Sequence, residues 1–229
     1  MKNIVVLSGA GISAESGIST FRESNGLWEN HRIEDVATPE GWEANPKLVL
    51  QFYNQRRKQL FEVEPNEGHK ALVKLEDFYD VQIVTQNVDD LHERAGSSNV
   101  LHLHGELKKV SSTIDHNLVY DLNNWELKYG DTCEKGSQLR PYIVWFGEAV
   151  PNIIFAEEIV READILIIVG TSLNVYPAAG LVDVIKEEAE VYIVDPGDVL
   201  INDNKNITVL KAGAVEGLAE LVNKLTNSK

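Results

Sequence analysis

Short apolar runs alternate with longer amphipathic stretches along most of this chain. The apolar runs have the length of buried strands. They occupy residues 4–7, 81–85, 100–103, 165–169, 191–194 and 207–210. The amphipathic stretches predict helices over residues 67–76, 153–161, 178–188 and 215–224. Buried strands separated by helices predict an α/β fold, a doubly wound parallel sheet of the Rossmann-like kind, in which ligands bind at the carboxyl ends of the strands.

Two regions break this alternation, residues 24–64 and 108–140. We expect them to form a smaller inserted lobe. The larger lobe then comprises about residues 1–23, 65–107 and 141–229. A chain of 229 residues suits one domain built in this way.

The first strand leads into a glycine-rich turn. Gly9, Gly11 and Ala14 fit the G-x-G-x-x-G/A spacing, in which glycines let the backbone approach a pyrophosphate closely. The usual acidic ribose-binding residue is missing, because Glu34 and Asp35 lie in a polar stretch without a strand pattern. The turn indicates a nucleotide site unlike that of an ordinary dehydrogenase, and a purely structural glycine turn is the alternative.

Five segments in a fixed order carry a more specific signal. They read GAGISAESGISTFR at residues 9–22, TQNVDDLH at 85–92, HLHGEL at 102–107, VWFGE at 144–148 and GTSLNVYP at 170–177. In this order and spacing they resemble the sirtuins, the NAD-dependent protein lysine deacylases. The resemblance extends from about residue 2 to about residue 225. It implies NAD as the cofactor and acyl-lysine proteins or peptides as partners, with free lysine, nicotinamide and O-acyl-ADP-ribose as products.

The resemblance makes His104 the general base. An isolated histidine at a strand end is more often structural, but imidazole titrates near neutrality and therefore suits proton acceptance. In the implied reaction the acyl oxygen attacks the anomeric carbon of the nicotinamide ribose, nicotinamide leaves, and His104 deprotonates a ribose hydroxyl. Two-residue alternation predicts His102 on the same strand face as His104, in a structural or supporting role.

The resemblance also implies that Asn87 and Asp89 act in catalysis by orienting the nicotinamide group. The alternative is a helix N-cap formed by Asp89 and Asp90. The full set implied for the cofactor is Gly9, Ala10, Gly11, Ile12, Ala14, Phe21, Arg22, Gln86, Asn87, Val88, Asp89, Gly170, Thr171, Ser172 and Ala214. In this set Phe21 would shield the reacting carbon from water and Arg22 would pair with phosphate oxygens. Family members usually carry an asparagine after the strand at 191–194, where this chain has Asp195.

Two further segments are implied to bind the substrate peptide as an added strand. Their residues are Phe146, Gly147, Glu148, Asn174, Val175 and Tyr176. Such binding uses backbone atoms first, so it says little about which proteins are substrates.

A helical stretch at residues 48–57 bears on the choice of acyl group. Tyr53 and Arg56 are three residues apart and therefore share a helix face. They resemble the Tyr-x-x-Arg pair of the sirtuin branch that removes succinyl and malonyl groups, whose carboxylate a guanidinium and a phenol can bind. The alternative is a solvated basic face, since Arg57 and Lys58 are adjacent.

The inserted lobe departs from the family pattern. Most sirtuins hold a structural zinc there with two pairs of cysteines, whereas this chain has SSTID at residues 111–115 and only Cys133 in the second place. Because structural zinc needs four thiolate or imidazole ligands, we predict no zinc; adventitious metal at His116 and Cys133 is the alternative. We expect the lobe to be held instead by packing of Ile114, Leu118, Tyr120, Trp125 and Leu127.

Composition limits the partners. The chain has 21 basic and 36 acidic residues, a net charge of −15, which argues against a nucleic-acid surface. Its apolar runs are too short for a membrane span. The first strand begins near residue 3, which leaves no room for a signal peptide. We therefore expect a soluble cytoplasmic protein with no membrane or nucleic-acid partner.

Two other functions would use the same NAD site. A mono-ADP-ribosyltransferase would omit the acyl-lysine step, and a non-catalytic NAD-sensing module would omit chemistry altogether. The presence of His104 and of both peptide-binding segments weighs against the first, and Asn87, Asp89 and His104 together weigh against the second. The sequence favours an enzyme, an NAD-dependent deacylase with deacetylase and desuccinylase activity.

Overall fold

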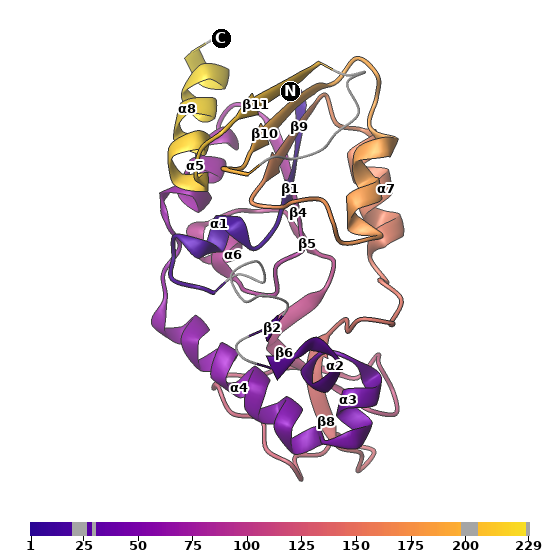
Figure 1. Cartoon of the computed structure of the whole chain (residues 1–229). Coiled ribbons are helices and arrows are strands. Elements are labelled where there is room, and N and C mark those ends of the chain that lie inside the picture. Colours follow the sequence, from indigo (N-terminus) through magenta and orange to yellow (C-terminus); the bar gives the residue numbers. More distant parts are fainter. Residues whose placement is uncertain (20–26, 29–30, 198–205, 228–229) are drawn as a thin grey trace.

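A computed structural model describes residues 1–19, 27–28, 31–197 and 206–227 of the chain. In the upper part of Figure 1 helices lie against both faces of a parallel sheet, and in the lower part α4, α2 and α3 lie near β6 and β8. Within the described residues, no helix has both the length and the hydropathy needed to cross a membrane.

The parallel sheet has six strands in the order β11-β10-β9-β1-β4-β5. Their bounds are β1 (Asn3–Ser8), β4 (Asp80–Thr85), β5 (Val100–His102), β9 (Ile165–Val169), β10 (Glu190–Val194) and β11 (Ile207–Leu210). The order reverses at β1, because β4 and β5 lie on one side of it and the last three strands lie on the other. Such a reversal opens a crevice at the carboxyl ends of the central strands. The predicted doubly wound α/β sheet is confirmed.

Strand β1 is buried on both faces, and its alternate side chains enter two separate cores. Ile4 and Val6 pack among residues of α5 and α8 on one face of the sheet. Val5 and Leu7 pack among residues of α7 and the 3₁₀ helix η2 on the other. The covering helices are α5 (Glu67–Leu75), α8 (Ala214–Asn227), α7 (Ile153–Arg161) and η2 (Ala178–Val184). A strand covered on both faces reads as a continuous apolar run, which is why the sequence reveals it.

The predicted elements of this sheet are present with small shifts at their ends, and two expectations are wrong. The helix expected over residues 178–188 is the shorter 3₁₀ helix η2, which ends at Val184. The strand expected over 100–103 ends at His102, so His104 follows the strand and does not share a strand face with His102.

The second region is built around a three-stranded antiparallel sheet in the order β7-β6-β8. Its elements are β2 (Leu27–Trp28), β3 (His31–Arg32), α2 (Ile33–Val36), α3 (Pro39–Ala44), α4 (Pro46–Glu62), β6 (Gly105–Ser112), β7 (Val119–Asp121) and β8 (Leu139–Ile143). Short helices α1 (Gly11–Ala14) and α6 (Leu91–Ala95) complete the described elements. Helix α4 begins at Pro46, and the Asn45 side chain accepts the Leu48 N–H at 3.1 Å as its N-cap. The lobe boundaries expected near residues 107 and 141 fall inside β6 and β8.

Packing in this region differs from the expectation at two of five positions. Ile114 and Trp125 are 64% and 40% exposed, so neither is a core residue. Leu127 is buried with Leu50 and Val110 in a small core, against which Tyr120 packs. Leu118 is half-buried.

Hydroxyl groups occupy the part of this region where relatives were expected to carry zinc ligands. The Cys133 thiol donates a hydrogen bond to Ser112 Oγ at 3.3 Å, and Thr113 Oγ1 lies 2.5 Å from Ser137 Oγ. In the described part of the chain, no three His, Cys, Asp or Glu side chains gather closely enough to hold a metal ion. One thiol among hydroxyls does not fit a tetrahedral zinc site. The same two segments are joined here by hydrogen bonds.

A buried arginine on α4 ties this region together. Arg57 has no exposed surface, and its guanidinium donates hydrogen bonds to the carbonyls of Leu107 and Trp125 and to Asn54 Oδ1. Asn54 in turn accepts the Leu127 N–H at 2.9 Å. Burial lowers the pKa of Arg57 to about 10, so the group remains charged at neutral pH. One cation thus joins α4, β6 and the loop before residue 128.

Replacing this arginine is expected to loosen the second region. In Arg57→Leu the two carbonyls and the amide lose a charged donor while they stay buried, which costs about 2 to 4 kcal/mol in the free energy of unfolding. Urea unfolding followed by circular dichroism measures this loss. The neighbouring Lys58 is exposed, so Lys58→Leu is the matched control, and an equal loss in both variants would contradict the role of Arg57.

Candidate active site

The site forms where the turns after β1 and β9 meet. The Gly11 N–H donates to the carbonyl of Gly170 at 2.8 Å, and the Gly9 N–H donates to that of Val169 at 3.0 Å. Gly170 has a φ of +63°, and a Cβ on it would lie 2.3 Å from the backbone nitrogen of Ile12. Only glycine allows this approach. The carboxyl ends of two central strands are therefore held together at the point where the strand order reverses.

The loop after β4 adds a buried polar network to these turns. Asn87 Nδ2 donates to the carbonyl of Gly9 and to Ser13 Oγ, each at 3.2 Å. Ser13 Oγ donates in turn to Asp89 Oδ2 at 2.9 Å. Asn87 and Asp89 are each only 6% exposed. The two residues predicted to orient nicotinamide thus lie together beside the glycine turn.

Asp89 also performs the capping role that was its alternative interpretation. Its Oδ1 accepts the N–H of Leu91 at 3.2 Å, at the start of α6, whereas Asp90 caps nothing with its side chain. Burial raises the pKa of Asp89, although the hydrogen bonds from Leu91 and Ser13 oppose this shift. The carboxyl group is therefore both a structural cap and a buried polar group at the site.

Gln86 links this loop to the turn after β9. Its Nε2 donates to Thr171 Oγ1 at 3.1 Å, and the same hydroxyl oxygen accepts the Leu173 N–H at 3.2 Å. Thr171 is buried and Ser172 is half-buried, as their place after a central strand predicts.

His104 is held in one tautomer by its neighbour. Its Nδ1 lies 3.0 Å from the carbonyl oxygen of Gln86. A carbonyl oxygen can only accept, so Nδ1 carries the proton and Nε2 keeps its lone pair. Burial lowers the pKa of His104, against a smaller opposite effect of the Gln86 hydrogen bond. Gly105 follows with a φ of +85°, where a Cβ would lie 2.1 Å from the Tyr142 carbonyl oxygen, and it starts β6 directly after the histidine.

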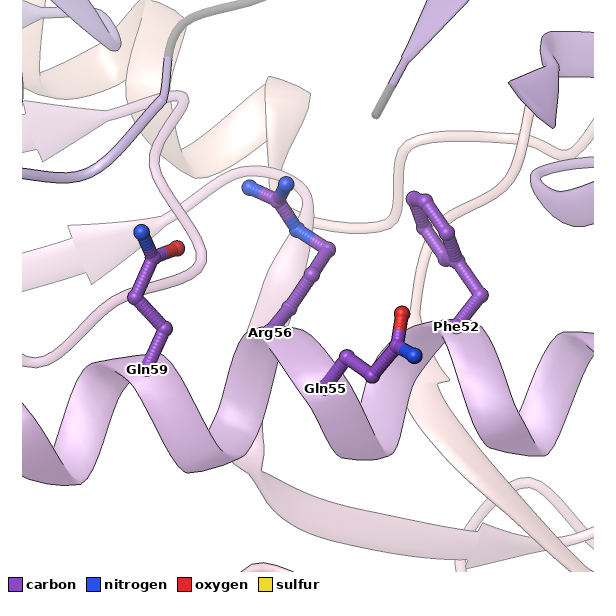
Figure 2. A pocket seen from close by; sticks show the side chains of 4 residues that line it. All are labelled: Phe52, Gln55, Arg56 and Gln59. Atoms are coloured by element: carbon purple, nitrogen blue, oxygen red, sulfur yellow. The ribbon is translucent and has the colours of Figure 1, made fainter. Parts of the chain in front are cut away.

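A small cavity lies on α4. It has a volume of about 140 Å³, and Phe52, Gln55, Arg56 and Gln59 line it. Figure 2 shows Phe52, Arg56 and Gln59 projecting from the same side of the helix. The guanidinium carbon of Arg56 lies 5.7 Å from the centre of the Phe52 ring. An arginine that is 8% exposed is thus part of the cavity wall.

Tyr53 does not line this cavity, contrary to the expectation that it shares a wall with Arg56. It is fully buried, and its hydroxyl oxygen accepts a hydrogen bond from Trp145 Nε1 at 3.1 Å. Burial raises the pKa of Tyr53, while Trp145 and the charge of Arg56 act in the opposite direction. The phenol is therefore neutral and buried.

The two segments expected to bind peptide are exposed at some of their residues and half-buried at others. Phe146 and Tyr176 are 47% and 76% exposed, and Asn174 and Gly147 are exposed as well. Val175 is half-buried.

Glu148, in contrast, has a structural role. Its two carboxylate oxygens accept hydrogen bonds from Arg140 at 2.7 and 3.1 Å, and one of them also accepts the Trp145 N–H at 2.7 Å. Burial alone would raise the pKa of Glu148, but Arg140 and the Trp145 N–H hold it below its usual range. The carboxylate shapes the turn that precedes it.

The remaining predicted cofactor residues surround the first turn. Ile12 is buried, Ala10 and Ala14 are half-buried, and Val88 is half-buried in the loop after β4. Ala214 begins α8, whose next N–H, that of Val215, donates to Glu15 Oε1 at 2.9 Å. Phe21 and Arg22 lie outside the described residues.

Sequence reasoning missed several residues that build the site. Ser13 lies within the first motif and bridges Asn87 to Asp89, and its position between named residues was the available signal. Asp195, in place of the usual asparagine, is buried and accepts the Gly197 N–H at 2.8 Å. Arg140 gave no local signal, because its partner Glu148 is identified only by the fold.

Comparisons with known proteins agree with this geometry. The model of the Sir2 family matches residues 9–177. An NAD-dependent protein deacylase of Bacteroides thetaiotaomicron is 56% identical over 226 residues, which is 96% of this chain and 97% of that protein. A protein of the same name from Helicobacter pylori is 57% identical over 227 residues, 98% of each chain.

Solved structures give the same result. The fold matches that of a Sir2 homologue in complex with NAD with a TM-score of 0.90 at 38% identity, covering 99% of this chain and 90% of that one. It also matches Sir2 bound to an acetylated peptide with a TM-score of 0.81 at 28% identity, covering 97% and 93%. With relatives of one name matched over nearly its whole length, the chain belongs to the Sir2 family, the sirtuins, and is an NAD-dependent protein deacylase.

Proposed function

We propose that this deacylase removes negatively charged acyl groups such as succinyl and malonyl from lysine side chains, in addition to acetyl. The observation that carries the proposal is Arg56, a buried arginine in the wall of a cavity of about 140 Å³. A fixed guanidinium in a chain of net charge −15 supplies a local cation for a carboxylate at the far end of an acyl chain.

The residues at the sheet edge suit NAD. The close approach of the turns at Gly11 and Gly170 leaves backbone, not side chains, at the crevice. A buried amide at Asn87 and a buried carboxyl at Asp89 lie beside it, and these groups suit a carboxamide and a ribose. Bound NAD supplies a nicotinamide–ribose bond whose cleavage opens the ribose carbon to attack by the acyl oxygen.

His104 is proposed to take up the proton in this reaction. The Gln86 carbonyl holds the proton on Nδ1, so the basic Nε2 is free of it, and the lowered pKa keeps the ring neutral at physiological pH. A neutral imidazole of fixed tautomer is ready to accept a proton from a ribose hydroxyl. Asn87 and Asp89 are proposed to orient the nicotinamide half, since their network with Ser13 fixes both side chains.

The peptide is proposed to lie between residues 146–147 and 174–176. The exposed backbone at Gly147 and Asn174 supports this arrangement, as does the acetylated peptide named for a solved relative. The Tyr53 hydroxyl accepts a hydrogen bond from Trp145, the residue before Phe146. In this way the buried phenol joins α4 to the segment that carries Phe146.

Removing the imidazole tests its assignment. In His104→Ala, nicotinamide release in the presence of acetylated peptide is expected to fall about 10²- to 10⁴-fold, because a general base is lost. NAD affinity, measured by calorimetry, is expected to stay within about threefold of the wild type. His116 is exposed, and His116→Ala serves as the control. A variant at position 104 that keeps its nicotinamide release would favour a different base.

Replacing the cavity arginine tests the acyl preference. In Arg56→Met, kcat/KM for a succinylated peptide is expected to fall about 10- to 100-fold, since a charge-assisted pair with the acyl carboxylate is lost. The acetylated version of the same peptide should react at nearly the wild-type rate, with both products followed by mass spectrometry. Arg161→Met, on the exposed side of α7, is the matched control. Equal loss on both peptides would remove Arg56 from the recognition of the carboxylate.

A further inference from the structure

The loop after β4 is held by three donors from one neighbouring segment. The carbonyl of Gln86 accepts a hydrogen bond from His104, that of Asn87 accepts one from His102, and that of Val88 accepts the Leu107 N–H at 2.7 Å. Three successive carbonyls are thus fixed by residues 102–107. Of these three donors, only His102 also forms a hydrogen bond with an acidic side chain, that of Glu93.

We propose that His102 is a positioning residue of the deacylation reaction, a cation that is clamped by Glu93 and that sets the loop carrying Asn87 and Asp89. The proposal rests on the proposed roles of Asn87 and Asp89. His102 and the predicted base His104 bind neighbouring carbonyls of the same loop, so His102 would act through the backbone.

The hydrogen bonds of the ring define its charge. His102 Nδ1 lies 2.8 Å from the Asn87 carbonyl oxygen, and Nε2 lies 2.7 Å from Glu93 Oε1. Burial would raise the pKa of Glu93, but the hydrogen bond and charge of His102 hold it below its usual range, so Glu93 is ionised. A carbonyl and an ionised carboxylate can only accept, so both ring nitrogens must donate. A neutral ring has one N–H and would turn a lone pair toward one of the two oxygens. Only the imidazolium satisfies both contacts.

The surroundings of the ring agree with a positive charge. Burial would lower the pKa of His102, but the hydrogen bond and charge of Glu93, the Asn87 carbonyl and the charge of Glu106 together raise it above the ordinary value. Three further titratable groups belong to this environment, Asp89, His92 and Lys109. Burial raises the pKa of Asp89 and the charge of His102 opposes this shift, while Lys109 Nζ lies 2.7 Å from Glu106 Oε1. His92 is itself kept neutral mainly by burial. His102 is therefore a cation near the carboxylates of Glu93 and Glu106, and Glu106 also pairs with Lys109.

The consequence for catalysis concerns high pH. When His102 loses its proton, either the Asn87 carbonyl or Glu93 faces a lone pair, and the loop shifts. Among the described residues, the backbone of Asn87 has one other hydrogen bond, from its N–H to Thr85 Oγ1 at 3.0 Å. Because small displacements of positioning groups can cost up to about 100-fold in rate, the rate should fall as the pH rises through the pKa of His102.

Glu93→Gln is the sharpest variant. A glutamine at this position can donate its amide N–H to a neutral Nε2, so neutral His102 would still donate from Nδ1 to Asn87. We expect the kcat for nicotinamide release to keep its value near pH 7 within about threefold and to lose the alkaline decline of the wild type. At low pH, kcat should still fall in both the wild type and Glu93→Gln, because that decline reports protonation of His104.

Two variants of the ring complete the test. His102→Leu removes the donor and is expected to lower kcat about 10- to 100-fold with little change in the KM for peptide. His102→Asn places an amide N–H near the former Nδ1 and is expected to restore most of that loss without an alkaline decline. Glu188→Gln, at an exposed carboxylate, is the control. Circular dichroism shows whether each variant folds. If His102→Leu does not fold, the pH profile of Glu93→Gln tests the proposal.

A direct titration supplies the independent measurement. Histidine-labelled protein followed by NMR should show His102 titrating above the ordinary range in the wild type, at the same pH as the alkaline decline in kcat, and at a lower pH in Glu93→Gln. An unshifted His102, or an identical alkaline decline in Glu93→Gln, would overturn the proposal. If Asn87→Ala keeps wild-type kcat, the proposed roles in the loop fail; if Asn87→Ala loses activity and His102→Leu does not, only the present inference fails.

Discussion

The active-site region depends on the hydrogen bonding of one loop, residues 86–89, between two glycine turns and the segment that follows β5. Three of its carbonyls accept hydrogen bonds, from His104, His102 and the Leu107 N–H. The Asn87 side chain donates a hydrogen bond to the carbonyl of Gly9. A loop with three successive carbonyls paired has little freedom to relax. The tautomer of the predicted base and the position of the predicted nicotinamide-orienting groups are consequently set by the same contacts.

The second region is ordered by a buried arginine and by hydrogen bonds between hydroxyl and thiol groups. Arg57 joins three segments through carbonyl oxygens, and hydroxyl and thiol groups at Ser112 and Cys133 join the two segments of the family's zinc site. Both solutions fix segments that lie far apart in the sequence. A buried guanidinium with several acceptors suits this purpose, because its donors point in several directions within one plane.

The sequence predicted those features that depend on local pattern. The strands at 4–7 and 165–169 were evident because strands covered on both faces are continuously apolar, and the glycines of the turns were evident because close approach requires them. Side-chain destinations were not evident. Glu148 was expected at the peptide but pairs with Arg140, and Tyr53 was expected in the cavity but meets Trp145. Such partners come from distant segments, and only the fold brings them together.

Trp145 connects helix α4 to the turn at residues 146–148. Its indole N–H donates to Tyr53, its ring lies 3.4 Å from the guanidinium carbon of Arg140, and its backbone N–H donates to Glu148. The next residue, Phe146, is exposed and its N–H donates to the Ala37 carbonyl at 3.0 Å. Trp145 therefore joins the buried Tyr53 of α4 to the turn at residues 146–148. A change that moves this indole would disturb both contacts, so helix α4, which carries Arg56, and the turn proposed to bind the peptide are physically coupled through one side chain.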